Sequence, residues 1–260
     1  ILFVSSEVIP YLPNNDISSL SYNLPKMVNE NGGQTRIFIP KYGVINERRH
    51  QLHEVIRLSG MNLAINDMDM PLIIKVASIP KERMQVYFID NEDYFKRNDL
   101  LLDKNEKLLK DNDERMIFFT KGVIETVKKL NWSPDIIHLN GWFTSLFPLY
   151  FKTMFSEEPI FSKSKIVSSI YSKPFDGTLS KSLVKKIQFD DIEENIDILS
   201  EPDFYNLTDI MIKFSDSIIL STDKTDKKIL KIINKYSKDY LSYSDSQDDD
   251  QLMGFLNLHK

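Results

Sequence analysis

Four side chains with ligand-binding chemistry lie at or just after the ends of short apolar runs: Glu7, His138, Trp142 and Tyr171. A carboxylate accepts hydrogen bonds, imidazole and phenol groups donate and accept them, and an indole ring offers a flat apolar face. In an open α/β sheet, ligands bind beyond the carboxyl ends of the strands. The sequence therefore predicts a binding site at that edge, beginning in the loop at residues 10–16.

Each of these four residues also has an ordinary structural role open to it. Glu7 can bond to amides of its own loop, and His138 can be a hydrogen-bonded histidine of the core. Trp142 can pack beneath a cleft rather than contact a ligand, and Tyr171 is compatible with either role. The sequence leaves both interpretations open, and we assign no catalytic residue.

The sequence offers no pattern for a metal or a nucleotide cofactor. His50 and His53 are three residues apart, but no third ligand stands at metal-binding spacing, so we expect both on the surface. The glycine-rich patterns of dinucleotide and ATP-phosphate loops are absent, and so is the zinc-protease motif. We therefore expect no cofactor and no metal.

Composition is that of an ordinary globular protein, with 42% hydrophobic and 27% charged residues among 260 and a net charge of −5. An acidic chain argues against general nucleic-acid binding, which needs a basic surface. The absence of cysteine excludes disulfides, thiol nucleophiles and thiolate metal sites and fits a reducing compartment. No apolar run approaches the roughly 20 residues that cross a bilayer, so we expect no membrane association and a cytoplasmic location.

Apolar strands alternate with amphipathic helices along the chain. Strands are predicted at residues 1–4, 36–40, 71–77, 85–90, 135–139, 165–170 and 217–220. Helices are predicted after the first loop and at residues 114–130, 143–153, 205–214 and 225–236. The alternation predicts an α/β fold, a Rossmann-like and mainly parallel sheet with helices on both faces. The strands at 71–77 and 85–90 are close enough to form a hairpin at the edge of the sheet.

Local signals predict where the first long helix begins and ends. Asp16 or Ser18 can cap its start, and Gly32 and Gly33 can end it. The mixed composition of residues 44–70 suggests a short helix or an irregular surface segment.

The chain is predicted to form one domain, because no linker and no internal repeat interrupts it. We assign residues 1–240 to this domain. Residues 241–260 contain a small polar and acidic run and are predicted to form a polar, partly flexible tail.

Several ordered motifs resemble bacterial glycogen synthases and plant starch synthases. The matching stretches are residues 5–11 (SSEVIPY), 36–43 (RIFIPKYG), 86–91 (VYFIDN), 111–115 (DNDER), 134–138 (PDIIH) and 148–150 (PLY). The resemblance covers about residues 1–225. It implies the N-terminal half of a GT-B glycosyltransferase, in which two Rossmann-like domains transfer glucose from ADP-glucose to an α-1,4-glucan in the cleft between them.

The sequence departs from this family where the family holds its sugar nucleotide. The family's Lys-x-Gly-Gly-Leu loop suits a diphosphate, because glycine amides approach it closely and lysine adds positive charge. Residues 13–17 read Pro-Asn-Asn-Asp-Ile instead, and Asp16 adds negative charge. The family's His-Ala-His-Asp-Trp becomes His-Leu-Asn-Gly-Trp at residues 138–142. Tyr171 stands where the family has a histidine beside the transferred glucose, and a tyrosine titrates near 10.

Two hypotheses of function follow. The first is a glucosyltransferase domain of the glycogen and starch synthase type, weak or inactive alone, in which Glu7, His138, Trp142 and Tyr171 contact the substrate. The second is a non-catalytic glucan-binding, regulatory or protein-interaction module on the same scaffold. The expected partners are an α-glucan or ADP-glucose, together with a protein partner or a second copy that takes the place of the family's C-terminal domain.

Overall fold

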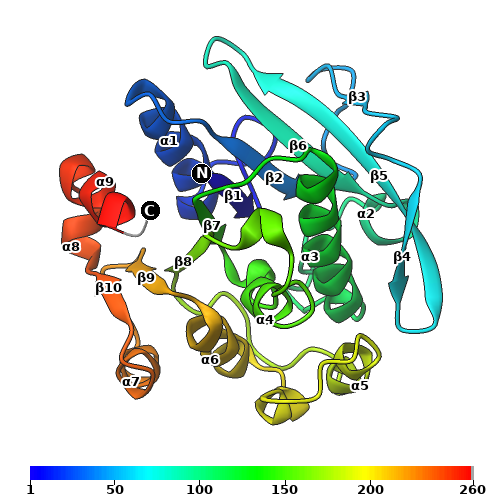
Figure 1. The fold of residues 1–260 in the computed structure, drawn as a ribbon. Coiled ribbons are helices and arrows are strands. Elements are labelled where there is room, and N and C mark those ends of the chain that lie inside the picture. The colour runs from blue at the N-terminus through cyan, green and yellow to red at the C-terminus, as the bar shows by residue number, and fades with distance from the viewer. Residues whose placement is uncertain (259–260) are drawn as a thin grey trace.

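The fold is built on a twisted sheet that the computed structural model describes within residues 1–258 (Figure 1). Ten strands in this part of the chain follow the order β10-β9-β8-β7-β1-β2-β6-β5-β3, with β4 paired to β5. The parallel strands are β1 (Leu2–Ser5), β2 (Arg36–Pro40), β6 (Met84–Asp90), β7 (Ile136–Asn140), β8 (Lys165–Ile170), β9 (Ser217–Leu220) and β10 (Asp239–Leu241). The antiparallel additions are β3 (His53–Glu54), β4 (Met61–Ile65) and β5 (Met68–Ile79). The predicted mainly parallel sheet is confirmed.

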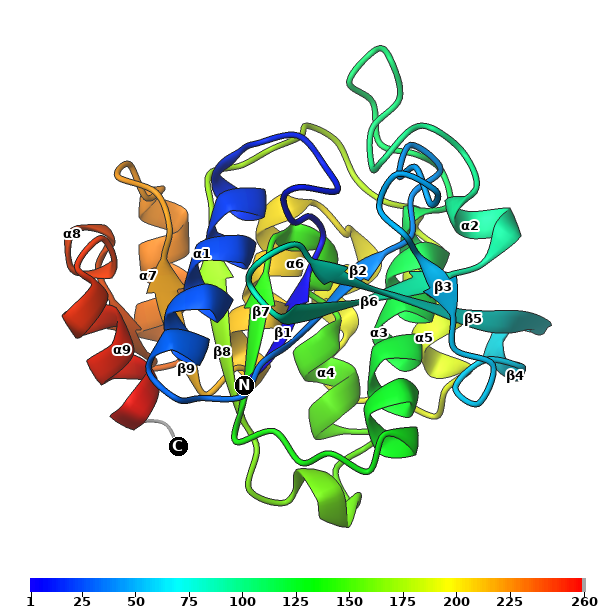
Figure 2. The ribbon, with the colours of Figure 1, turned by 90° about the horizontal axis from the view of Figure 1, so that it is seen from above.

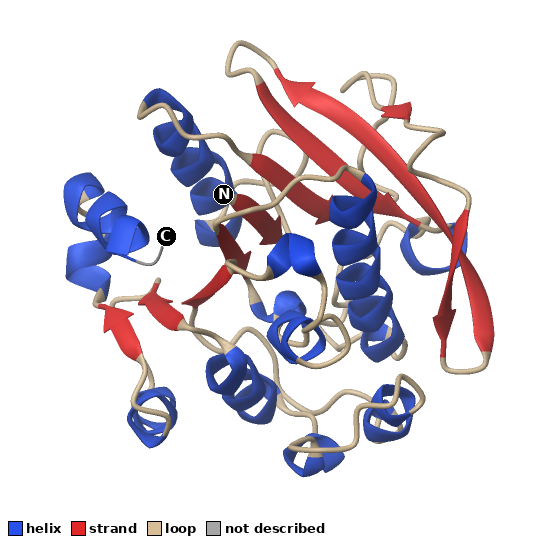
Figure 3. Cartoon of the chain, in the orientation of Figure 1, coloured by secondary structure: helices blue, strands red, loops and turns tan. Residues whose placement is uncertain are grey.

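Helices cover both faces of the sheet, as Figures 1 and 3 show. One face carries α1 (Asp16–Glu30), α8 (Tyr243–Ser246) and α9 (Asp249–Leu258). The other carries α3 (Asn112–Lys129), α4 (Phe147–Lys152), α6 (Phe204–Phe214) and α7 (Lys227–Lys235). The shorter helices α2 (Glu92–Phe95) and α5 (Leu183–Gln188) lie at the periphery. Right-handed crossovers explain why the helices divide between the two faces. A crossover helix lies on one face when the chain moves one way along the sheet, as from β1 to β2, and on the other face when it moves the opposite way, as from β7 to β10.

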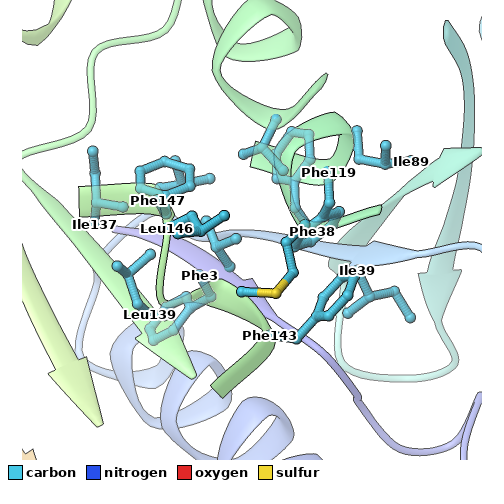
Figure 4. Packing of buried hydrophobic residues seen from close by; sticks show 14 of the residues in the cluster. Phe3, Phe38, Ile39, Ile89, Phe119, Ile137, Leu139, Phe143, Leu146 and Phe147 are labelled. Atoms are coloured by element: carbon cyan, nitrogen blue, oxygen red, sulfur yellow. The ribbon is translucent and has the colours of Figure 1, made fainter. Parts of the chain in front are cut away.

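Aromatic side chains fill the core between the sheet and the α3–α4 layer (Figure 4). Phe38 of β2 comes from the centre of the sheet, Phe119 of α3 and Phe147 of α4 come from the helices, and Phe143, which follows β7, packs on Phe119. All four are almost completely buried. A parallel strand covered on both faces must be apolar throughout, which is why β1 and β7 appear in the sequence as continuous apolar runs.

The start of α1 differs from the prediction in one residue. Asn15 is the N-cap, because its Oδ1 accepts from the amide of Ser18 at 2.8 Å while Ser18 Oγ accepts from the amide of Asn15 at 2.9 Å. Asp16 is therefore the first helical residue, and Ser18 is the reciprocal member of the capping box. The helix ends just before Gly32, whose φ of +79° suits glycine.

The helix alternative for residues 44–70 is wrong, because this region contributes β3 and β4 to the antiparallel edge. A short apolar run does not reveal whether it is a helix or an edge strand until its pairing partner is known. The hairpin prediction for the neighbouring strands is confirmed, since β5 and β6 pair antiparallel.

The segment predicted as a polar tail is largely helical. It contains the end of β10, α8 and α9, and Leu252 and Leu256 of α9 are buried. The small apolar face of α9 was hidden by the acidic run before it, and only packing reveals it. Residues 259–260 of the predicted tail lie outside the described residues, and its flexibility stays a prediction.

A buried ion pair joins α3 to the segment after α5. The Nζ of Lys121 lies 2.5 Å from an Asp190 carboxylate oxygen, and both side chains are 5% exposed. The Tyr150 hydroxyl donates to the other Asp190 oxygen at 2.8 Å, and Lys121 also donates to the Ala64 carbonyl at 2.7 Å. A charge pair with this many partners is tolerated in a core, whereas either partner alone would not be.

Lys121→Ala is expected to lower the free energy of unfolding by about 3–5 kcal/mol, because the Asp190 charge stays buried without its partner. Urea denaturation followed by circular dichroism measures the loss. The control is Lys96→Ala, which removes an exposed 3.3 Å pair with Glu92 and should change stability little. Equal effects of the two substitutions would contradict this account.

Candidate functional site

A pocket of about 300 Å³ opens at the carboxyl edge of the sheet, where the first loop meets the chain that follows β8. We call it the Trp142 pocket; its lining includes Asn15, Asp16, Trp142, Tyr171, Lys173, Phe204 and Ser221. Figure 2 shows the loop after β1 and the chain after β8 on the same side of the molecule. The pocket therefore lies at the edge that the sequence predicted, since the parallel strands all end there.

Trp142 forms an aromatic wall of this pocket. It follows β7, is partly exposed, and packs its ring against Phe175 with centroids 4.7 Å apart. Phe175 in turn contacts Phe204 edge-on at 6.0 Å. A supported, partly exposed ring can stack on the apolar face of a sugar.

Tyr171 closes the pocket from the end of β8. Its hydroxyl donates to Asn140 Oδ1 at 2.5 Å, and Asn140 Nδ2 donates to the Ile17 carbonyl at 3.0 Å and also to the Ser21 hydroxyl. Burial raises the pKa of the Tyr171 phenol well above its ordinary value, so the proton stays on at neutral pH. Tyr171 can donate or accept a hydrogen bond here but cannot act as a general base near pH 7.

Glu7 contributes to the site indirectly. Its Oε2 accepts from Asn15 Nδ2 at 2.6 Å, and Asn15 is the residue that lines the pocket. Burial raises the pKa of the Glu7 carboxyl, and the hydrogen bond from Asn15 opposes this shift. Glu7 thus holds the N-cap of α1 in place, and a direct contact between Glu7 and a ligand remains a prediction.

His138 lies in the core beneath the pocket. Its ring is 1% exposed, its Nε2 is 2.8 Å from Ser169 Oγ, and its edge meets Phe3. Ser169 is a lining residue, so His138 supports the pocket floor from behind. Burial lowers the pKa of His138 to about 3, which keeps the imidazole neutral. A direct contact between His138 and a ligand remains a prediction.

Asn140, Asn15 and Gly141 are site residues that sequence reasoning did not select. Asn140 and Gly141 occupy changed positions of the family motif, and that change is the signal that could have found them. Gly141 has a φ of +88°, and a Cβ at this position would lie 2.7 Å from Ser6 Oγ. The backbone here accepts glycine and no larger residue without a shift.

The electrostatics of the pocket are neutral to acidic. Asp16 is exposed at its edge, and the lining cation Lys173 is paired with Asp176 at 2.5 Å. Within residues 1–258 no cluster of three or more His, Cys, Asp or Glu side chains could hold a metal. In the same part of the chain no helix is both long and apolar enough to cross a membrane. The arrangement suits hydrogen bonding and stacking to a neutral polar ligand and lacks the positive charge that a diphosphate needs.

Comparison with known proteins agrees with the fold. Residues 1–238 match the family described as the starch synthase catalytic domain. The chain is 39% identical over 188 residues to a glycogen synthase of Chlorobium limicola and 34% identical over 233 residues to one of Chlorobaculum parvum. These matches cover 72% and 88% of this chain but only 38% and 47% of the relatives.

A solved structure shares the fold. It is the catalytic domain of starch synthase IV from Arabidopsis thaliana bound to ADP and acarbose, with a TM-score of 0.75 and 16% sequence identity. The similarity covers 94% of this chain and 52% of that one.

The fold is a Rossmann-like domain of the kind that forms the N-terminal half of GT-B glycosyltransferases. The chain belongs to the glycogen and starch synthase family, in its starch synthase catalytic domain. It spans less than half the length of the two glycogen synthases compared above.

The buried His138 makes stability depend on pH. Its pKa falls from 6.5 in the unfolded chain to about 3 in the folded protein, so between these values only the unfolded state binds the proton. The stabilisation is complete above about pH 6.5 and is lost as the pH falls toward 3. Urea midpoints at pH 7.5 and pH 5 should therefore differ more for the wild type than for His138→Gln. Parallel pH dependence in the two proteins would contradict the assignment.

Proposed function

We propose that this chain binds an α-1,4-glucan in the Trp142 pocket, as the acceptor side of a glycogen- or starch-synthase-type glucosyltransferase. We further propose that the chain transfers little or no glucose from ADP-glucose by itself. The observation that carries the proposal is the supported, partly open Trp142 ring in a pocket whose only lining cation within residues 1–258 is already paired.

Glucan binding fits the chemistry of the pocket. Sugar hydroxyls can donate to the Asp16 carboxylate and exchange hydrogen bonds with Tyr171, while a ring face stacks on Trp142. The Arabidopsis structure is bound to ADP and acarbose, which supports a ligand site in this fold. Family membership supports the same ligand class.

Binding of ADP-glucose is less well supported by the residues present. The loop at residues 13–16 offers Pro13, which has no backbone donor, and the exposed Asp16 carboxylate. A glycosyl transfer needs preorganised groups around both the sugar and the leaving phosphate. Tyr171 keeps its proton and Lys173 is paired with Asp176, so we propose that other residues supply the donor side.

Trp142→Ala is expected to weaken binding of maltoheptaose about tenfold or more, because stacking and apolar contact are lost together. Isothermal titration calorimetry of the purified chain measures the affinity. The matched control is Trp132→Ala, since Trp132 precedes β7 at the opposite edge of the sheet and stacks on Arg36. Equal maltoheptaose affinity in wild type and Trp142→Ala would overturn the proposed site.

ADP-glucose is expected to give no binding heat and no glucose transfer to maltoheptaose with the chain alone. Radiolabelled ADP-glucose provides the sensitive assay for transfer. Turnover that is abolished by Tyr171→Phe would show that the phenol takes part in catalysis and would overturn the proposal of an inactive site. Binding without turnover would instead show that the loop at residues 13–16 holds a nucleotide.

A further inference from the structure

A second pocket of about 250 Å³ adjoins the Trp142 pocket. It lies between α1, the carboxyl ends of the strands β8 and β9, and α8, and we call it the α8 pocket. The two pockets share Asp16, Tyr171, Ser221 and Thr222, so these residues form the boundary between them. The Trp142 pocket alone is at the lower end of the usual size of about 300–1,000 Å³ for a ligand site, and the α8 pocket alone is below it, whereas the two together lie within it.

The α8 pocket has the hydrogen-bonding groups of a sugar site. Its lining includes the carboxylates of Asp16 and Asp223 and the amides of Asn23 and Gln247. Carboxylates accept from hydroxyl groups, and amides both donate and accept. No lysine, arginine or histidine lines it in the described part of the chain, so an anionic ligand would meet two negative charges with no compensation.

Hydroxyl groups stand on the shared boundary. Tyr171 and Thr222 line both pockets, and a hydroxyl can both donate and accept a hydrogen bond. A glucan that passes from one pocket to the other would meet these groups.

We propose that the α8 pocket is a second sugar subsite, continuous with the Trp142 pocket, which binds a further neutral hexose unit of the same glucan. This inference rests on the proposed function, because the Trp142 pocket must hold the first unit. Tyr243, Ser246 and Gln247 form the wall of the subsite that comes from α8 and the residue after it. The subsite makes the protein favour longer glucans over maltose.

Calorimetry with maltose and maltoheptaose tests the subsite in the full chain. The wild type should bind maltoheptaose more tightly than maltose, because only the longer ligand reaches both pockets. Gln247→Trp fills the α8 pocket. It should weaken the binding of maltoheptaose about tenfold and leave the affinity for maltose unchanged. The matched control is Gln251→Trp, the same substitution at an exposed position of α9 that does not line either pocket.

Asn23→Ala gives a second, milder variant that removes an amide without adding bulk. Asn23 is exposed on α1, so the substitution does not disturb the core. It should weaken the binding of maltoheptaose about threefold. Wild-type maltoheptaose affinity in both Asn23→Ala and Gln247→Trp would overturn the subsite. Equal wild-type affinity for the two sugars would overturn it as well.

The outcomes separate failure of the subsite from failure of the proposed function. If Trp142→Ala weakens the binding of maltose, but Gln247→Trp and Asn23→Ala bind maltoheptaose like the wild type, only the subsite is wrong. If the wild type binds neither sugar, the proposed function and the subsite are both wrong. If, against expectation, the wild type binds ADP-glucose and Gln247→Trp abolishes that binding while maltoheptaose binds as before, the pocket holds an anionic ligand and the sugar assignment is overturned.

Discussion

The Asn140 amide connects the three elements that make the site. It leaves the end of β7, donates to the Ile17 carbonyl and the Ser21 hydroxyl of α1, and accepts from the Tyr171 hydroxyl after β8. A buried amide with its donors and acceptor satisfied fixes its neighbours strongly, because any displacement leaves a polar group unpaired. The spacing between the first helix and the end of β8, and with it the width of the Trp142 pocket, depends on this one side chain.

The replacements at the motif positions support one another. Gly141 has a backbone conformation that leaves no room for a Cβ beside Ser6, so the aspartate of the family motif would not fit without a shift. Asn140 at the family's second histidine and Tyr171 at its later histidine bond directly to each other. The described residues thus keep the scaffold and replace ionisable groups by a neutral, satisfied network. This pattern is the physical basis for proposing a saccharide site of weak or absent catalytic power.

The fold was largely predictable because its signals are local or depend only on burial. Continuous apolar runs such as β1 and β7 identified central parallel strands, and the chain order of strands and helices then restricted the topology. The antiparallel edge of the sheet was harder to predict, since β3 and β4 are short and are strands only because they pair with β5. The apolar face of α9 was missed for a related reason, because Leu252 and Leu256 matter only once α9 has a surface to pack on.

By itself, the sequence determined the family, the fold class and the edge of the sheet where the Trp142 pocket lies, because each follows from residue order and strand direction. Only the tertiary structure separated the four selected residues by role. Trp142 and Tyr171 line the pocket, whereas His138 supports its floor and Glu7 holds the helix cap. The tertiary structure also revealed the α8 pocket, whose walls come from segments some 220 residues apart such as Asn23 and Gln247. Pairwise distance between remote side chains is set by packing of the whole domain, and no local pattern in the sequence encodes it.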